Sequence, residues 1–312
     1  MYLEDRMGPS TLIMGKAGAQ AIKYMVNNAV KAGFKAVEIC PAQFYSVDPV
    51  IDPSFLERVF GEGDRMRLKD MLSQFRIVTV HGSSWWVTKI RENVYEEELW
   101  RPYIELLHFA HDIGAHIVSF HPLQREMGCD LSQNEMSEYH IKFGSMAAEY
   151  AEELNLLAAF ENMPRNGDWS LFENILDIVT KIRSEKFGLL FDIGHAALQL
   201  GISTGIDTLR IIRKIEHCIH QTFELHISGV QNTGKDFNMS RNLTDHRPLD
   251  EYNVLDYGQI MSFLKRKKFD GPIILEIFYK NAGEKRASFK ENLESCILAK
   301  KELSEYWTSK SH

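Results

Sequence analysis

The sequence predicts an α/β protein, a (β/α)8 barrel formed by a single domain that spans residues 1–312. Three observations lead to this prediction. Short apolar runs alternate with amphipathic helical patterns, which is typical of a parallel sheet with helical crossovers. Eight such units favour a closed barrel over a doubly wound open sheet, whose Gly-rich phosphate fingerprint the sequence lacks. Finally, polar residues that can bind metal recur at regular intervals where the apolar runs end.

The overall composition is that of a globular protein rather than a disordered one. The chain has 312 residues, of which 44% are hydrophobic and 25% charged, and barrels commonly reach this size as one domain. The net charge of −7 argues against a broad electrostatic grip on nucleic acid and leaves a local basic patch open.

Several absences bear on the compartment. The sequence has no signal-peptide pattern and no apolar run that approaches the length of a membrane span. The four cysteines are scattered without metal-type spacing, as in proteins whose thiols stay reduced. We expect a cytoplasmic protein with no membrane partner, and a homo-oligomer is left open.

The secondary structure elements follow from local patterns, taken in chain order. The apolar residues Leu12, Ile13 and Met14 are a candidate for a short first strand. Apolar residues at helical spacing predict a helix over 17–32, which Gly33 ends. Later strands are short apolar runs between turn residues, and they cover 34–40, 76–81, 116–121, 156–161, 187–192, 221–227 and 272–277. Later helices repeat the helical spacing, and they lie near 54–73, 96–113, 132–154, 170–183, 205–217, 256–267 and 285–307.

Two connections stand out. The loop after strand 76–81 contains Trp85 and Trp86, which either line a pocket or interface or pack over the barrel mouth, since paired tryptophans are costly on a bare surface. Segment 229–254 is polar and rich in Gly and Asn, and connections of this length are usually functional or disordered. We predict that it lies over the carboxyl ends of the strands, because it follows strand 221–227 directly.

Six apolar runs end in a residue that can bind a metal ion. The intervals between these residues are 40, 40, 31, 34 and 50, each about one strand, one helix and two loops. Because the carboxyl ends of all barrel strands meet at one face, these side chains should converge. Glu38, after Val37, is a further case. The six residues are His81, His121, Glu161, Asp192, His226 and Glu276.

Four of these residues form the predicted metal site: Glu161, Asp192, His226 and Glu276. Three carboxylates held close together cannot all stay ionised without a cation, because repulsion raises at least one pKa. Such an oxygen-rich set suits Mn²⁺, Mg²⁺ or Co²⁺, and Zn²⁺ also fits. We predict one shared divalent ion at about 2.0–2.4 Å from the ligand atoms. Taken singly, each residue has a simpler explanation, such as Asp192 capping the next helix with His195 over its first turn.

Five motifs carry a resemblance to a known family: Phe160-Glu-Asn162, Phe191-Asp-Ile-Gly-His195, Leu225-His-Ile-Ser228, Asp245-His-Arg-Pro-Leu249 and Leu275-Glu-Ile277. By these motifs the chain resembles the xylose isomerase-like TIM-barrel superfamily. That superfamily holds sugar isomerases and epimerases, inosose dehydratase-like enzymes and type IV apurinic/apyrimidinic endonucleases. The resemblance covers the chain after about residue 30 and implies the same four-residue metal site.

The resemblance also suggests roles for further histidines. His195 matches a substrate-side histidine of the epimerases or a ligand of a further zinc in the endonucleases. His81 and His121 match positions that bind an additional zinc in the endonucleases, and could equally bind substrate or form hydrogen bonds at the barrel mouth.

The loop after the seventh strand departs from the endonuclease-like pattern. That pattern has an acidic residue two positions before the loop histidine, whereas Thr244 stands there before His246 and Asp245 is adjacent. This departure argues against a complete set of three zinc ions. Arg247 either holds an anionic group such as phosphate or is a solvated loop residue.

The favoured function is a divalent-metal-dependent isomerase or epimerase of a sugar, sugar phosphate or polyol, working by proton transfer through an enediolate. Glu161 and Glu276 would transfer protons, and His195 or Glu38 would be the next candidates for a base. The alternative is a zinc-dependent phosphodiesterase like endonuclease IV, acting on abasic DNA. A barrel that binds a sugar or metal without turnover is the third hypothesis.

Overall fold

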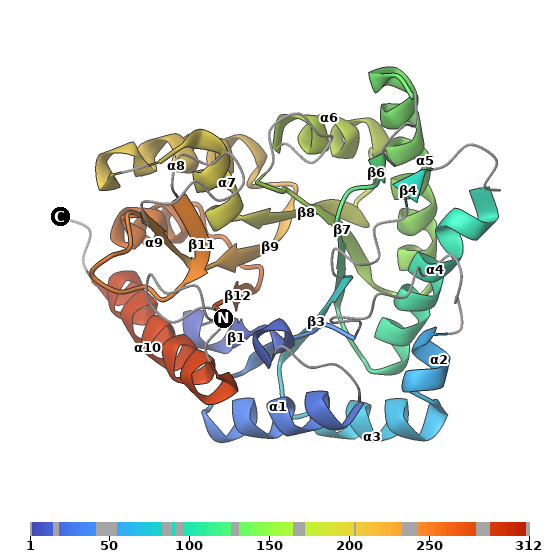
Figure 1. Cartoon of the computed structure of the whole chain (residues 1–312), viewed down its shortest axis with the longest axis horizontal. Helices are drawn as coiled ribbons and strands as arrows, with labels where there is room; N and C mark the ends of the chain where they lie inside the picture. Colours follow the sequence, from blue (N-terminus) through green and yellow to red (C-terminus); the bar gives the residue numbers. More distant parts are fainter. Residues whose placement is uncertain are drawn as a thin grey trace.

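Eight parallel strands form a nearly closed (β/α)8 barrel with helices around it (Figure 1), which confirms the predicted fold class. The computed structural model describes residues 2–14, 19–41, 55–82, 89–90, 96–125, 131–164, 172–202, 204–232, 243–278 and 288–309. The barrel strands are β1 (Met7–Pro9), β2 (Ala36–Ile39), β3 (Ile77–Gly82), β5 (Ile117–Phe120), β7 (Leu157–Glu161), β8 (Phe187–Asp192), β9 (Thr222–Ile227) and β12 (Ile273–Leu275).

The strand order around the barrel determines which strand ends are neighbours. It runs β1-β12-β9-β8-β7-β5-β3-β2, and all paired neighbours are parallel. A parallel bridge between Ser10 and Glu38 brings the edges formed by β1 and β2 together. As a result β7, β8, β9 and β12 lie side by side, and their carboxyl ends face the same side of the molecule.

The helices form the outer layer. None of the described helices is long and apolar enough to cross a membrane. Their bounds are α1 (Ala19–Lys31), α2 (Phe55–Val59), α3 (Glu62–Leu72), α4 (Glu96–Asp112), α5 (Gln133–Glu153), α6 (Phe172–Ile182), α7 (Ile193–Leu200), α8 (Thr208–Cys218), α9 (Tyr257–Arg266) and α10 (Phe289–Thr308).

The two longest helices begin with the same local device. Ser132 before α5 and Ser288 before α10 each accept a hydrogen bond from the backbone N–H three residues later, and the Glu at that position bonds back. Such capping boxes satisfy N–H groups that the helix itself leaves without partners. On α5, Phe143 stacks on Phe160 with 5.4 Å between ring centroids, so this helix supports the strand that ends in Glu161.

The first strand was predicted at the wrong place. Residues Thr11–Met14 form a 3-10 helix, and β1 lies upstream at Met7–Pro9. A Met-Gly-Pro strand has no β-branched residue to reveal it. Its glycine is nevertheless required, because a Cβ on Gly8 would collide with the carbonyl oxygen of Ala36 on β2.

Two predicted helices differ from the observed ones. The helix expected over 54–73 is two helices, because Gly61 adopts an extended conformation (φ −58°, ψ 165°) and starts α3 anew. The helix expected over 205–217 opens with a 3-10 turn before α8 begins. In addition, α7 directly follows β8.

Segment 229–254 is more ordered than expected for a loop. Its described part contains the antiparallel strands β10 (Gly229–Asn232) and β11 (Leu243–Arg247). These strands lie at the carboxyl ends of the barrel strands, as predicted, since the backbone N–H of Phe278 donates to the carbonyl of His246 at 2.9 Å. A second small sheet pairs β4 (Lys89–Ile90) with β6 (Gln124–Arg125). Trp85 and Trp86 lie outside the described residues.

Candidate metal centre at the strand ends

Four adjacent strands bring the predicted metal ligands together. Asp192 and His226 are register partners on β8 and β9, while Glu161 ends β7 and Glu276 follows β12. One ligand atom from each of the four lies within 4.8 Å of all the others. Each side chain is at most 3% exposed, so no bulk water screens the repulsion between the carboxylates.

The polar atoms of this cluster face one another, and some of them make no hydrogen bond. His226 Nδ1 lies 3.3 Å from Glu276 Oε2, 3.6 Å from Glu161 Oε1 and 3.8 Å from Asp192 Oδ2. Among the described residues, neither Asp192 Oδ2 nor Glu161 Oε1 makes a hydrogen bond. Buried polar atoms without partners are rare in folded proteins, and three carboxylates with one imidazole fit a divalent cation.

The charges within the cluster shift its pKa values strongly. Burial raises the pKa of Asp192 to about 6. Burial also acts to raise the pKa of Glu276, but the positive charge of His226 outweighs it and holds the pKa at about 2. For His226, burial favours the neutral ring, yet Glu38 and Glu276 together keep its pKa well above 6.5. A cation bound here would displace the imidazole proton, so metal binding should release protons.

The position of Asp192 is compatible with both alternatives that the sequence left open, a helix cap and a metal ligand. Its Oδ1 accepts a hydrogen bond from the backbone N–H of His195 at 2.6 Å and thereby caps α7, while Oδ2 faces the other ligands. Asn162 brackets the Asp192 backbone, donating to its carbonyl at 3.0 Å and accepting from its N–H at 2.8 Å. Asn162 therefore sets the position of β8 relative to Glu161.

A second group of ligand atoms flanks the centre on the β3 and β5 side. His121 Nε2 and His81 Nε2 lie 2.9 and 3.2 Å from Glu161 Oε2, and 3.3 Å from each other. Burial acts to raise the pKa of Glu161, but the two histidines outweigh it and hold this pKa well below the usual range. His81, His121 and Glu161 could together hold an ion or grip a substrate oxygen.

A third group flanks the centre on the other side. His195 Nε2 lies 3.5 Å from Asp245 Oδ2, and His246 Nε2 lies 3.7 Å from Asp245 Oδ1. The one-residue offset of the acidic residue from the endonuclease-like pattern therefore does not separate it from the histidines. Gly194 permits this approach, since a Cβ there would lie 3.0 Å from the Asp245 Cβ.

Two other predicted site residues are not members of the four-residue cluster, although Glu38 forms a further group of possible ligands with Glu224 and His226. Glu38 is fully buried behind His226, with its Oε2 2.9 Å from His226 Nε2. Arg247 is 4% exposed, and its Nε donates to the hydroxyl of Thr244 at 3.1 Å. Arg247 is thus not a solvated loop residue.

Two more buried polar residues, Asn162 and Glu224, lie beside the cluster and were not among the predicted site residues. Asn162 stood in a quoted motif directly after Glu161. Glu224 lies two residues before His226 on β9, so both side chains face the barrel interior. Burial and the neighbouring Glu38 raise the pKa of Glu224 to about 8. The alternation of β9 would have revealed it.

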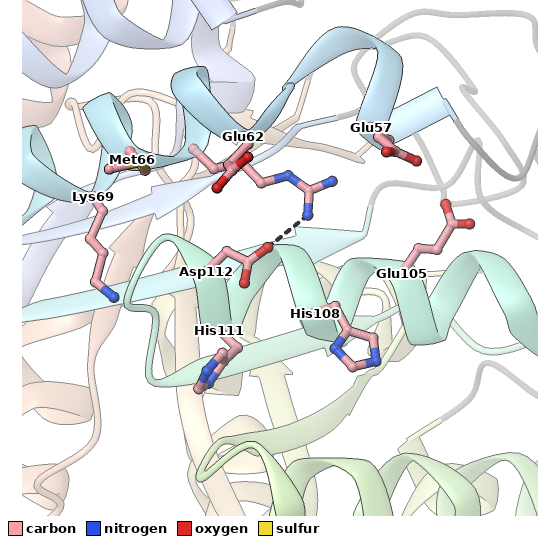
Figure 2. Close-up of a pocket in the computed structure, with 9 residues that line it drawn as sticks. Glu57, Glu62, Met66, Lys69, Glu105, His108, His111 and Asp112 are labelled. Atoms are coloured by element: carbon pink, nitrogen blue, oxygen red, sulfur yellow. Dashed lines mark hydrogen bonds and ion pairs between the residues drawn. The ribbon is translucent and has the colours of Figure 1, made fainter.

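A cavity of about 680 Å³ lies elsewhere, on the outer helical layer (Figure 2). It is lined by α2, α3 and α4, and the ion pair between Arg65 and Asp112 spans it at 2.7 Å. None of the potential metal-binding groups among the described residues includes one of its side chains. The candidate metal centre at the strand ends is therefore separate from this cavity.

The chain belongs to the xylose isomerase-like TIM barrel family, whose model matches residues 26–299. Among curated proteins, it is 24% identical over 199 residues to the uncharacterized protein MJ1311 of Methanocaldococcus jannaschii. That match covers 63% of this chain and only 58% of the relative.

Several solved structures share the fold along nearly the whole chain. D-psicose 3-epimerase from Clostridium cellulolyticum H10, solved with D-tagatose, has a TM-score of 0.69 at 13% identity, covering 98% of this chain and 100% of that one. The IOLI protein with a zinc atom has a TM-score of 0.70 at 16% identity, with coverages of 98% and 100%. For 3-keto-D-glucoside 4-epimerase YcjR from E. coli, the values are 0.63, 12%, 93% and 98%.

Proposed function

We propose that the protein is a divalent-metal-dependent isomerase or epimerase of a sugar or related polyol. The observation that carries this proposal is the convergence of Glu161, Asp192, His226 and Glu276 within 4.8 Å of one another at four adjacent strand ends. The similar structures support the substrate class, since the names of several describe epimerases of sugars, and one was solved with zinc.

The four residues divide into two roles in this proposal. A divalent ion held by them would polarise a substrate carbonyl. Glu161 and Glu276 come from β7 and β12, with β8 and β9 between them, so their carboxylates flank the site from two sides. One takes the proton from the carbon next to the carbonyl, and the other returns it. Asp192 and His226 mainly hold the ion.

The flanking histidines bind and orient the substrate in this scheme. Although burial favours the neutral rings, nearby carboxylates dominate and raise the pKa values of His81 and His195 to about 9. The largest opposing contributions come from Glu161 for His81 and from Asp192 for His195. Charged imidazoles can donate hydrogen bonds to substrate hydroxyl or carbonyl oxygens.

Proton exchange with solvent tests the proposed reaction type. Metal-free protein would be incubated in D₂O with a panel of ketohexoses and ketopentoses, each with Mn²⁺, Co²⁺, Mg²⁺ or Zn²⁺ added. The expected result is metal-dependent deuterium incorporation next to the carbonyl of at least one sugar, observed by NMR. Absence of exchange from the whole panel, with metal shown to be bound, would count against sugar isomerisation and epimerisation.

A zinc-dependent phosphodiesterase is the second candidate, favoured by one specific observation. The two flanking groups, His81–His121–Glu161 and His195–Asp245–His246, adjoin the central one. Three ions could thus be held side by side, as hydrolysis at abasic DNA would use. The net charge of −7 opposes this candidate. Three bound zinc ions per chain and cleavage of a duplex with one abasic site would favour it, whereas one ion and an intact duplex favour sugar chemistry.

A further inference from the structure

His226 is held from both sides of its ring. Its Nδ1 faces the three carboxylates of the proposed metal centre, and its Nε2 lies 2.9 Å from Oε2 of Glu38. Both side chains are completely buried, and the two residues are 188 positions apart in the sequence. The contact is therefore made by the closed barrel and depends on neither local sequence nor solvent.

The hydrogen bond at Nε2 determines which nitrogen of the His226 ring is available to a metal ion. The nitrogen that binds a metal must carry no proton, so in the neutral ring the other nitrogen carries it. A carboxylate that accepts the hydrogen bond from this second nitrogen fixes the tautomer and the ring orientation, and makes the ligating nitrogen more basic.

We propose that Glu38 is the positioning residue of the metal centre. Its carboxylate accepts a hydrogen bond from Nε2–H of His226 and so presents the bare Nδ1 to the ion. This proposal rests on the proposed metal site. Glu38 lies on β2, which is separated from β9, the strand of His226, by β12 and β1. The imidazole ring stands between Glu38 and the ligand atoms, so Glu38 acts on the ion through His226.

The position of Glu38 is itself constrained by its neighbours. The parallel bridge with Ser10 holds its backbone where β1 meets β2. The thiol of Cys40 lies 3.7 Å from its other oxygen, Oε1. Glu38 is thus fixed before any ion binds, which is what orienting a ligand requires.

Glu224 provides a matched control on the same polar cluster. It is a glutamate, completely buried like Glu38, and one of its oxygens lies within 4.8 Å of ligand atoms of Glu38 and His226. Among the described residues, however, neither of its carboxylate oxygens makes a hydrogen bond to His226. Comparing the two glutamates separates the hydrogen bond to Nε2 from a general effect of a buried acidic residue.

The test measures Co²⁺ binding to wild-type protein, Glu38→Gln, Glu38→Ala and Glu224→Gln by competition with a chromophoric chelator. We expect Glu38→Ala to weaken Co²⁺ affinity about 10–100-fold. Glu38→Gln should weaken the affinity less, because its amide oxygen still accepts a hydrogen bond. Glu224→Gln should bind Co²⁺ like the wild type. The Co²⁺-shifted N–H proton resonance, identified by its loss in His226→Gln, should move or disappear in both Glu38 variants and stay in place in Glu224→Gln. Circular dichroism of the metal-free variants checks that they are folded.

The possible results separate this inference from the proposed function. If wild-type protein binds no Co²⁺, both fall. If Glu38→Ala and Glu38→Gln, shown to be folded, bind Co²⁺ like the wild type, only the role of Glu38 is overturned. Equal weakening in Glu224→Gln and Glu38→Gln would also overturn it, because the effect would then not come from the hydrogen bond.

Discussion

Replacing Glu276 with Gln tests the proposed proton transfer, because it removes a base while preserving size and one neutral oxygen ligand. Oε2 of Glu276 faces Nδ1 of His226 at 3.3 Å and Nδ1 of His246 at 3.4 Å. By contrast, no described residue makes a hydrogen bond to Oε1. One oxygen is therefore held by the site, and the other is free to exchange a proton with substrate.

The expected loss follows from the role of this oxygen. General-base catalysis contributes about 10²–10⁴-fold to rate, which corresponds to about 3–5 kcal/mol in the activation free energy. With its pKa held at about 2 by His226 against the effect of burial, Glu276 is ionised at neutral pH but a weak base. Its contribution therefore depends on position more than on basicity. Glu161→Gln should fall in the same range.

The assay is deuterium incorporation into the sugar that the wild type exchanges, at saturating metal. His226→Ala is the control, since loss of a ligand should weaken metal affinity, and excess metal should restore part of the activity. If both Gln variants keep near-normal turnover with metal bound, the proton-transfer roles are wrong. His195 would then be the next candidate, because Glu38 lies behind the His226 ring.

Three further predictions concern the scaffold. Burial lowers the pKa of His140 to about 4, so the unfolded chain binds a proton more readily than the folded protein, and the free energy of unfolding should fall by about 3 kcal/mol as the pH drops from 6.5 toward 4. Urea denaturation should show a smaller loss in His140→Leu, and the same pH dependence in this variant as in the wild type would contradict the prediction. Gly194→Ala should lower the free energy of unfolding by about 1–3 kcal/mol, because the new Cβ would lie 2.9 Å from the Ser228 hydroxyl. Gly63→Ala on α3, where there is room for a Cβ, should stabilise the protein slightly, and equal shifts in melting temperature for the two variants would refute this. Ser132→Ala should cost about 1 kcal/mol by removing the α5 cap, and an unchanged melting temperature would show that the cap contributes nothing.

The barrel and its strand ends could be predicted because each depends on a short, continuous stretch of sequence. Each buried strand is a short apolar run, and the polar residue at its end is adjacent to it. The interval between such residues is set by one strand, one helix and two loops. The first strand could not be found in this way, because the need for Gly8 arises from the backbone of Ala36, which lies far along the chain.

The inner organisation of the site depends on contacts that no local pattern reveals. The sequence offered Asp192 as a helix cap or a ligand, and only the structure shows that Oδ1 caps α7 while Oδ2 faces His226. The hydrogen bond of Glu38 to His226 joins strands on opposite sides of the barrel closure. The approach of Asp245 to His195 depends on the absence of a side chain at Gly194. These arrangements follow from tertiary packing.

Anomalous diffraction from a crystal grown with Mn²⁺ would locate the proposed ion. We expect a peak between Glu161, Asp192, His226 and Glu276, at about 2.0–2.4 Å from an atom of each. His226 should bind through Nδ1 while Nε2 stays with Glu38. Crystals with no peak at this position, or with Mn²⁺ bound only by other residues, would rule out a metal centre formed by these four side chains.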